Sequence, residues 1–222
     1  MDMIKIIKGI KGLNAAGLFR NYFEARHHQY VIKRQWSLPH KDGLEIDVYD
    51  DDRAIYLLNL DEDESILSSI RMLPTTGPHL LTEVFSHLCQ KPIPAGVSVF
   101  EMTRYFVSPH VQKSKRLLES SGEVLIAMVE WAVLTGVTNI ISVIDEYFLP
   151  QMLEAGWRPT LLGHPLPYGG GPDYPGGGIA IAVNIPVSED CLSITRATHE
   201  ARRSVWPTAF QRVTTKSAGS WH

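Results

Sequence analysis

The sequence has few of the features that mark a secreted, membrane-bound or nucleic-acid-binding protein. Its 222 residues include only two cysteines, Cys89 and Cys191, which form neither a CxxC pair nor a zinc-binding motif. Two isolated thiols are typical of a reduced compartment, so we expect the protein to work in the cytoplasm. The formal net charge is −3, whereas nucleic-acid-binding proteins are usually clearly basic. We therefore expect no nucleic-acid partner.

Long apolar runs are also missing. No stretch approaches the roughly 20 apolar residues that span a bilayer, and Lys5, Lys8 and Lys11 interrupt the apolar residues near the start of the chain. We therefore expect no signal peptide and no membrane partner. The nine histidines lack helical ligand spacing and have no cysteine or carboxylate cluster beside them, so we expect no metal site.

The residues that are present suit one α/β domain. Hydrophobic residues make up 44% of the chain, enough for a sizeable core, and no linker divides residues 1–222. Apolar periodicity predicts helices over residues 14–34, 115–136 and 147–155, a short helix that ends at 85, and a last helix after 188. Short apolar runs predict strands over residues 54–60, 66–73, 97–107, 137–144 and 179–185, and one beginning at 157. This order predicts a mixed sheet covered by helices on both faces.

Charged residues stand inside two of these apolar elements. Arg26 lies in the apolar stripe of the first helix, where an inward guanidinium needs a carboxylate or a ligand as partner. Glu101 and Arg104 lie on a strongly apolar strand, and strict alternation puts them on opposite faces. A site shared by both requires a bulged or splayed strand between Phe100 and Phe106. Structural ion pairs are the alternative interpretation of these charges.

Other polar residues are weak signals alone and stronger together. Asp47 and Asp50 alone suggest a solvated acidic turn, and Arg71 alone suggests a surface residue at a strand end. The combined set is Arg26, Tyr30, Trp36, Asp47, Asp50, Arg71, Phe85 and the segment Glu101-Met102-Thr103-Arg104. In order and spacing it resembles the LuxI-type acyl-homoserine-lactone synthases, the autoinducer synthases, over the first half of the chain. Tyr30 stands where that family usually has Phe and Phe100 where it usually has Trp, so both departures keep an aromatic ring.

The resemblance implies a fold similar to the GNAT acyltransferases and a two-step acyl transfer. The amino group of S-adenosylmethionine attacks an acyl thioester, and the methionine carboxylate then closes the lactone. Methylthioadenosine and the free thiol carrier leave, and the lactone is a bacterial quorum-sensing signal. Both reactants are substrates, so the resemblance implies no cofactor.

The resemblance also implies roles for individual residues. The predicted catalytic residues are Glu101, as the base directly or through a water, and Arg104. The predicted S-adenosylmethionine-binding residues are Arg26, Trp36, Asp47, Asp50, Arg71, Phe85 and Arg104. The predicted acyl-pocket residues are Met102, Tyr105, Ser142, Ile144, Met152 and Trp157, although ordinary core packing is the alternative for each. The hydroxyl of Ser142 suits recognition of an oxo group on the acyl chain, and the small side chain suits a branched acyl chain.

Two questions stay open at this point. The acyl donor is acyl-CoA or acyl carrier protein. The helix over residues 146–154 has no Lys or Arg for an acidic carrier protein, which favours acyl-CoA. Lys113, Lys115 and Arg116 form a basic cluster that suits a carrier protein or a CoA phosphate. Two alternative functions stay open. One is a GNAT-type N-acyltransferase using acetyl-CoA, which would hold pyrophosphate on the backbone of a glycine-containing loop; residues 108–115 contain no glycine, which disfavours it. The other is a non-catalytic binding domain.

Overall fold

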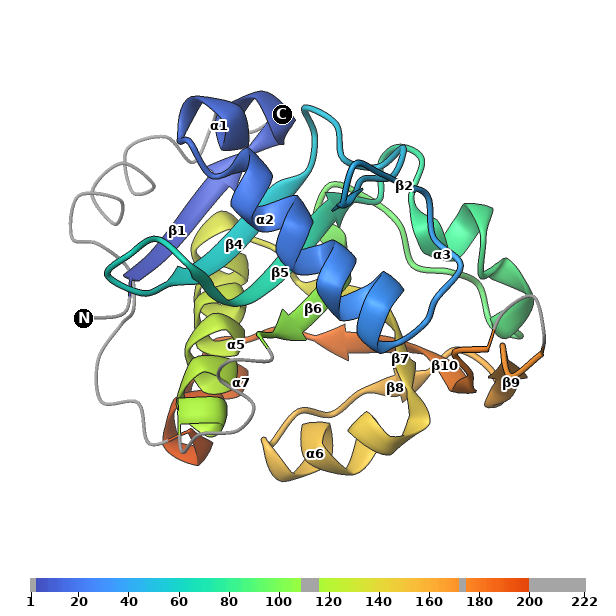
Figure 1. Ribbon diagram of the computed structural model, residues 1–222. Coiled ribbons are helices and arrows are strands. Elements are labelled where there is room, and N and C mark those ends of the chain that lie inside the picture. The colour runs from blue at the N-terminus through green and yellow to red at the C-terminus, as the bar shows by residue number, and fades with distance from the viewer. Residues whose placement is uncertain (1–2, 109–115, 172–174, 200–222) are drawn as a thin grey trace.

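One mixed β-sheet forms the centre of the computed structural model, which describes residues 3–108, 116–171 and 175–199 (Figure 1). Its strands follow the order β1-β4-β5-β6-β7-β10-β8, and β9 pairs with β10. The β6–β7 pair is parallel and the other pairs are antiparallel. The strands are β1 (Met3–Lys8), β4 (Ile55–Leu60), β5 (Ile66–Pro74), β6 (Val99–Val107), β7 (Asn139–Asp145), β8 (Thr160–Leu161), β9 (Leu166–Tyr168) and β10 (Gly178–Pro186). A separate hairpin pairs β2 (His40–Lys41) with β3 (Leu44–Glu45).

Helices cover both faces of this sheet, as the sequence predicts. Figure 1 shows α2 in front of β4, β5 and β6, with α5 behind them. The front face carries α1 (Gly9–Ala15), α2 (Phe19–Arg26), the π-helix η1 (His27–Lys33), α3 (Leu80–Glu83) and η2 (Ser86–Leu88). The rear face carries α5 (Arg116–Thr135) and α7 (Glu189–Thr198). Between β7 and β8 lie η3 (Glu146–Phe148) and α6 (Leu149–Glu154). No described helix is long and apolar enough to cross a membrane.

Strand alternation divides the core into a front and a rear part. On β4, Leu57 faces the rear and packs with α5, whereas Tyr56 and Leu58 face the front and pack with α2. Both β4 and β5 are buried along almost their whole length because helices cover both of their faces. These two strands match the predicted strands over residues 54–60 and 66–73 closely.

The N-terminal region differs from its prediction. The single helix expected over residues 14–34 is instead α1, α2 and η1, and Asn14 lies within α1 rather than capping a longer helix. Gly17 has φ of +72°, a left-handed conformation that interrupts the helix between α1 and α2. The strand β1 also pairs with β4 at the sheet edge, although the sequence pattern predicts no strand there. The strand expected from Trp157 begins only at Thr160.

A β-bulge on β6 meets the requirement set by Glu101 and Arg104. Opposite β5, Ser69 pairs with Phe106 and Arg71 pairs with Thr103, so β6 contains one extra residue between these pairs. Arg104 lies in that step with φ of +52°. The extra residue reverses the alternation, and Arg104 therefore lies on the same front face of the sheet as Glu101.

The pairing between β6 and β7 ends beside this bulge. The two parallel strands pair from Val99 and Asn139 to Met102 and Ser142, although both continue beyond that point. The Ser142 hydroxyl donates a hydrogen bond to the Met102 carbonyl at 2.9 Å, at the last paired position. The strand is thus both bulged and unpaired from β7 in the segment that the sequence singled out.

Candidate active site

Six charged side chains form a buried ion-pair network on the front face of the sheet. All six side chains are at most 9% exposed, and their formal charges cancel. The cations are Arg26 at the end of α2, Arg71 on β5 and Arg104 on the bulge of β6, and the anions are Glu45 on β3 and Asp47 and Asp50 in the following turn. Buried charges need this kind of mutual pairing, because desolvation of an unpaired ion is costly.

Arg26 is completely buried and joins α2 to the β3 segment. Its Nε donates to Glu45 Oε2 at 2.6 Å, and its Nη1 donates to Asp50 Oδ1 at 2.7 Å. Burial alone would raise the pKa of Asp50, but the charges of Arg26 and Arg71 outweigh it and hold that pKa well below its usual range. Asp50 is therefore ionised in the folded protein.

Arg71 and Arg104 bind the remaining carboxylate oxygens. Arg71 donates Nη1 and Nη2 to the two oxygens of Asp47 at 2.6 and 2.9 Å, the bidentate geometry that suits a guanidinium. Arg104 donates Nη2 to Asp47 at 2.8 Å and to Glu45 at 2.9 Å. Burial alone would raise the pKa of Glu45, but Arg26 and Arg104 lower it below its ordinary value.

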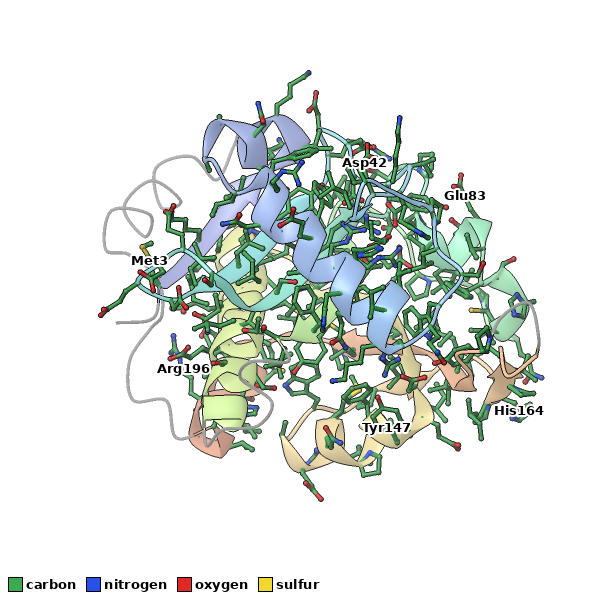
Figure 2. The ribbon with its side chains drawn as sticks, viewed as in Figure 1. Met3, Asp42, Glu83, Tyr147, His164 and Arg196 are labelled. Carbon is green, nitrogen blue, oxygen red and sulfur yellow. The ribbon has the colours of Figure 1, made fainter. Side chains whose placement is uncertain are left out.

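Local hydrogen bonds fix the turn that carries Asp47 and Asp50. The Tyr49 N–H donates to Asp47 Oδ1, and the Asp47 N–H donates to Asp50 Oδ2, each at 2.9 Å. These side-chain bonds to nearby backbone are the usual reason that Asp favours turns. The Tyr49 hydroxyl donates to Glu83 at 2.8 Å, and Glu83 lies on α3 (Figure 2). The turn is therefore tied to α3 as well as to the arginines.

Glu101 lies beside this network but binds a different partner. Its two oxygens accept hydrogen bonds from the backbone N–H groups of Leu80 and Leu81, at 2.8 and 2.7 Å, at the start of α3. Burial raises the pKa of Glu101 to about 7, although these N–H groups, Arg71 and Arg104 oppose the rise. A carboxylate with that pKa can both accept and return a proton near neutral pH.

Aromatic side chains continue the site from Arg104 toward Trp36. The Arg104 guanidinium lies 5.4 Å from the Tyr30 ring centre, and Tyr30 stacks on Trp36 with centroids 5.2 Å apart. The Tyr30 hydroxyl donates to the Tyr105 carbonyl at 2.9 Å, next to the bulge. Phe85 lies apart from this row, in the apolar cluster of Leu81 behind α3.

Comparison with known proteins shows the family to which the chain belongs. The sequence model of a family described as autoinducer synthase matches residues 13–192. The chain is 31% identical over 165 residues to isovaleryl-homoserine lactone synthase from Bradyrhizobium diazoefficiens, covering 73% of each chain. The chain belongs to the autoinducer synthase family. It is therefore an acyltransferase of the acyl-homoserine-lactone synthase class, as the sequence resemblance implies.

Solved structures of autoinducer synthases share the fold. A CoA-dependent acyl-homoserine lactone synthase, BjaI, with SAM and isopentyl-CoA has a TM-score of 0.79 and 25% identity, covering 92% of each chain. A second CoA-dependent synthase, MesI, has a TM-score of 0.77 and 28% identity, covering 91% of this chain and 97% of its own. A Lactobacillus plantarum protein described as an N-acetyltransferase has a TM-score of 0.53 at 15% identity and shows the GNAT-like fold alone.

The predicted acyl-pocket residues of this autoinducer synthase gather on the rear face. Met102, Met152 and Trp157 are buried in the α5 cluster, and Tyr105 and Ile144 pack against it. The surface hollow of about 350 Å³ that the structure shows over the β2–β3 hairpin is lined by none of them. The predicted S-adenosylmethionine and acyl residues therefore lie on opposite faces, and these faces meet where β6 leaves β7.

One residue of the site was not predicted, and one predicted basic cluster lies largely outside the described residues. Glu45 is fully buried and bridges two arginines, yet it was not among the predicted site residues. The alternation of Leu44, Glu45, Ile46 and Asp47 is the signal that could have found it, because alternate residues share a face. Lys113 and Lys115 lie outside the described residues, and only the backbone of Arg116 is described.

Proposed function

We propose that the protein makes an acyl-homoserine lactone from S-adenosylmethionine and an acyl-CoA. The observation that carries this proposal is the β6 bulge, which brings Arg104 onto the face of Glu101 and into the ion-pair network. Beyond Met102 and Ser142, β6 and β7 no longer pair with each other, and backbone groups on their facing edges would be available to an acyl thioester. The site thus has a candidate base and candidate carboxylate-binding cations beside the point where β6 and β7 stop pairing.

Exposure separates the network into a scaffold and a substrate-facing edge. The side chains of Arg26, Arg71, Glu45 and Asp50 are 0% exposed. Those of Arg104 and Asp47 are 7% and 9% exposed. We therefore assign the first four to holding the site. Arg104 would bind the methionine carboxylate, and Asp47 would face the ammonium or sulfonium charge.

Trp36 is the candidate platform for the adenosyl group. Its ring is half-buried, is stacked on Tyr30 and has the Arg34 guanidinium 4.8 Å from its centre. Because a cation already contacts this ring, its exposed part would pack on the adenosyl group rather than attract the sulfonium. Phe85 would act only if the adenosyl group reaches the α3 cluster.

In the first proposed step, Glu101 takes a proton from the ammonium group, directly or through a water. A reference α-amino pKa is about 8, close to the value of about 7 at Glu101, so the transfer is nearly balanced. The free amine attacks the thioester carbonyl carbon, the C–N bond forms and the C–S bond breaks. The proton on Glu101 passes to the departing thiolate, which leaves as the free thiol. The attacking nitrogen gives up its second proton to Glu101 as the amide forms, and Glu101 then releases that proton to solvent.

In the second proposed step, the methionine carboxylate attacks its own γ carbon. The new C–O bond closes the lactone while the C–S bond to the sulfonium breaks, and neutral methylthioadenosine leaves. The sulfonium already activates this carbon, so the step balances without a metal, a cofactor or another base. The protein contributes alignment of the two reacting ends, which Arg104 would supply by holding the carboxylate.

Acyl-CoA is the proposed donor for two reasons. Two synthases of similar structure are described as CoA-dependent, and one of them holds isopentyl-CoA. The η3–α6 segment of this chain also has no basic residue for docking an acidic carrier protein. Acyl carrier protein is the competing donor.

The test supplies S-adenosylmethionine with matched acyl-CoA and acyl carrier protein substrates that carry the same acyl groups. Mass spectrometry follows the lactone and methylthioadenosine, and Arg104→Ala is the control variant. We expect both products from acyl-CoA, in equal amounts, and neither from the control. Products from the carrier protein alone would refute the donor assignment. Release of thiol without methylthioadenosine would instead indicate the N-acyltransferase alternative.

A further inference from the structure

A second polar cluster joins the end of η1 to the end of β7. Asp145, the last residue of β7, accepts hydrogen bonds at 2.7 Å from Nη1 and Nη2 of Arg34 on its Oδ2 atom. The Tyr168 hydroxyl of β9 donates to its other oxygen, Oδ1. Arg34 also donates to the Tyr147 hydroxyl at 2.5 Å. The end of the α2–η1 helix lies beside β7 and β10 in Figure 1, where this cluster forms.

Both donors to Asp145 also contact Trp36. The Arg34 guanidinium lies 4.8 Å from the indole ring centre, within the range of a cation–π contact. The Tyr168 ring meets the indole edge-on, with centroids 6.0 Å apart and an interplanar angle of 79°. Tyr30 is stacked on the same indole, so three side chains contact Trp36. Asp145 binds two of the three, and its side chain is 8% exposed.

The backbone before Trp36 needs this external support. Gln35 has φ of +54°, a conformation that is unfavourable for a residue with a side chain. The Gly176 N–H donates to the Gln35 carbonyl at 3.2 Å, and the Trp36 N–H donates to the Tyr30 carbonyl at 2.9 Å. At Gly178 a Cβ atom would lie 3.0 Å from both Asp145 Oδ1 and the Tyr168 hydroxyl, so a glycine leaves room for their bond.

We propose that Asp145 is a positioning residue for S-adenosylmethionine. It acts through Arg34 and Tyr168, which hold the Trp36 indole in the orientation that receives the substrate. This inference rests on the proposed function, because it needs Trp36 to contact S-adenosylmethionine. The carboxylate is required because it has two acceptor oxygens for two separate donors. An asparagine offers one oxygen and one NH2 group, so one donor would lose its partner.

The test measures S-adenosylmethionine binding by calorimetry in the wild type and in Asp145→Asn. A hydrogen bond to a charged group is stronger than a neutral one, and part of the loss should reach the substrate through the indole. We expect the dissociation constant to rise by roughly five- to tenfold. In turnover assays KM for S-adenosylmethionine should rise by a similar factor, while kcat changes less than about twofold.

A double-mutant cycle tests whether Asp145 acts through Trp36. If it does, Asp145→Asn should weaken binding no further in a Trp36→Phe background, because the group that it positions is already altered. Additive losses would overturn the proposal. Tyr168→Phe removes one of the two donors and should give a smaller loss than Asp145→Asn.

Glu130→Gln is the matched control. Glu130 also accepts from one arginine, Arg196, at 2.8 Å, and its side chain is 5% exposed against 8% for Asp145. Figure 2 shows Arg196 well apart from Tyr147, so this pair is remote from the Trp36 cluster. Equal weakening by Glu130→Gln and Asp145→Asn would overturn the proposal, as would wild-type binding by Asp145→Asn. A wild type that binds S-adenosylmethionine but forms no lactone would refute the proposed function alone.

Discussion

Removal of the Glu45 charge is the sharpest test of the ion-pair network. Glu45 is fully buried and accepts from Arg26 Nε at 2.6 Å and from Arg104 Nη2 and Nε at 2.9 and 3.2 Å. Glu45→Gln keeps the shape of the side chain but leaves three buried cations with two anions. Its amide NH2 group would also face guanidinium N–H donors, so one side of the amide has no acceptor.

The structure sets the size of the expected effect. Breaking a buried ion pair by removing one partner costs about 3–5 kcal/mol, because the other charge stays buried without compensation. In a chain of 222 residues, each kcal/mol lowers Tm by about 2–4 °C. We therefore expect Glu45→Gln to lower Tm by about 6–20 °C. Total stabilities of about 5–15 kcal/mol imply that a folded population remains at room temperature.

Thermal unfolding followed by circular dichroism measures this effect. Glu24→Gln is the control, because its pair with Arg20 has side chains that are 65% and 47% exposed and should contribute only about 0.3–0.5 kcal/mol. Arg26→Met combined with Glu45→Gln restores a neutral network and should be less destabilised than the sum of the single changes. Equal Tm values for Glu45→Gln and Glu24→Gln would refute the buried network as the basis of this site.

Further expected outcomes concern single residues of the site. Glu101→Gln should lower kcat far more than it weakens S-adenosylmethionine binding, and unchanged turnover would remove Glu101 from the base role. The wild-type kcat should rise with pH through about 7, as Glu101 loses its proton, and a flat profile would contradict this. Folding raises the pKa of Glu101 from 4.5, so its contribution to stability is fully present below that pH and is lost as pH rises through about 7. Tyr30→Phe should cost about 1 kcal/mol through its bond to the Tyr105 carbonyl but retain activity. Arg104→Lys should weaken S-adenosylmethionine binding, measured as KM, more than it reduces folding stability, measured as Tm, because a lysine keeps the charge and loses the fork geometry.

Local sequence signals predicted the centre of the sheet well and its N-terminal side poorly. The strands over residues 54–60 and 66–73 have short apolar runs and an acidic turn between them, all of which are local features. The helix predicted over residues 14–34 is confirmed over 19–33, as α2 and η1, and was wrong at its start, because the backbone turns out of the helix at Gly17. The strand β1 is stabilised by pairing with β4, a long-range contact that the local pattern does not reveal.

The site shows the same limit. The resemblance supplied most members of the network, and five of the predicted residues do form ion pairs with one another or with Glu45. Alternation showed that Glu101 and Arg104 needed a bulge, but it could not say which residue is inserted. That choice depends on the partner strand, since the bulge is defined by Ser69 and Arg71 on β5. Glu45 was missed because its burial depends on α2 and β6, which are distant in sequence.

The position of Arg104 links backbone strain to charge. A residue with a side chain at φ of +52° costs about 1–2 kcal/mol relative to an ordinary strand conformation. On an unbulged strand, alternation would direct the guanidinium to the rear, into the apolar cluster of Met102. None of the three carboxylates of the network lies there. Burying an unpaired cation there would cost more than the strain. The network therefore offsets the strain of the bulge. The bulge in turn makes Arg104 the most exposed of the three cations and places it facing the proposed substrate.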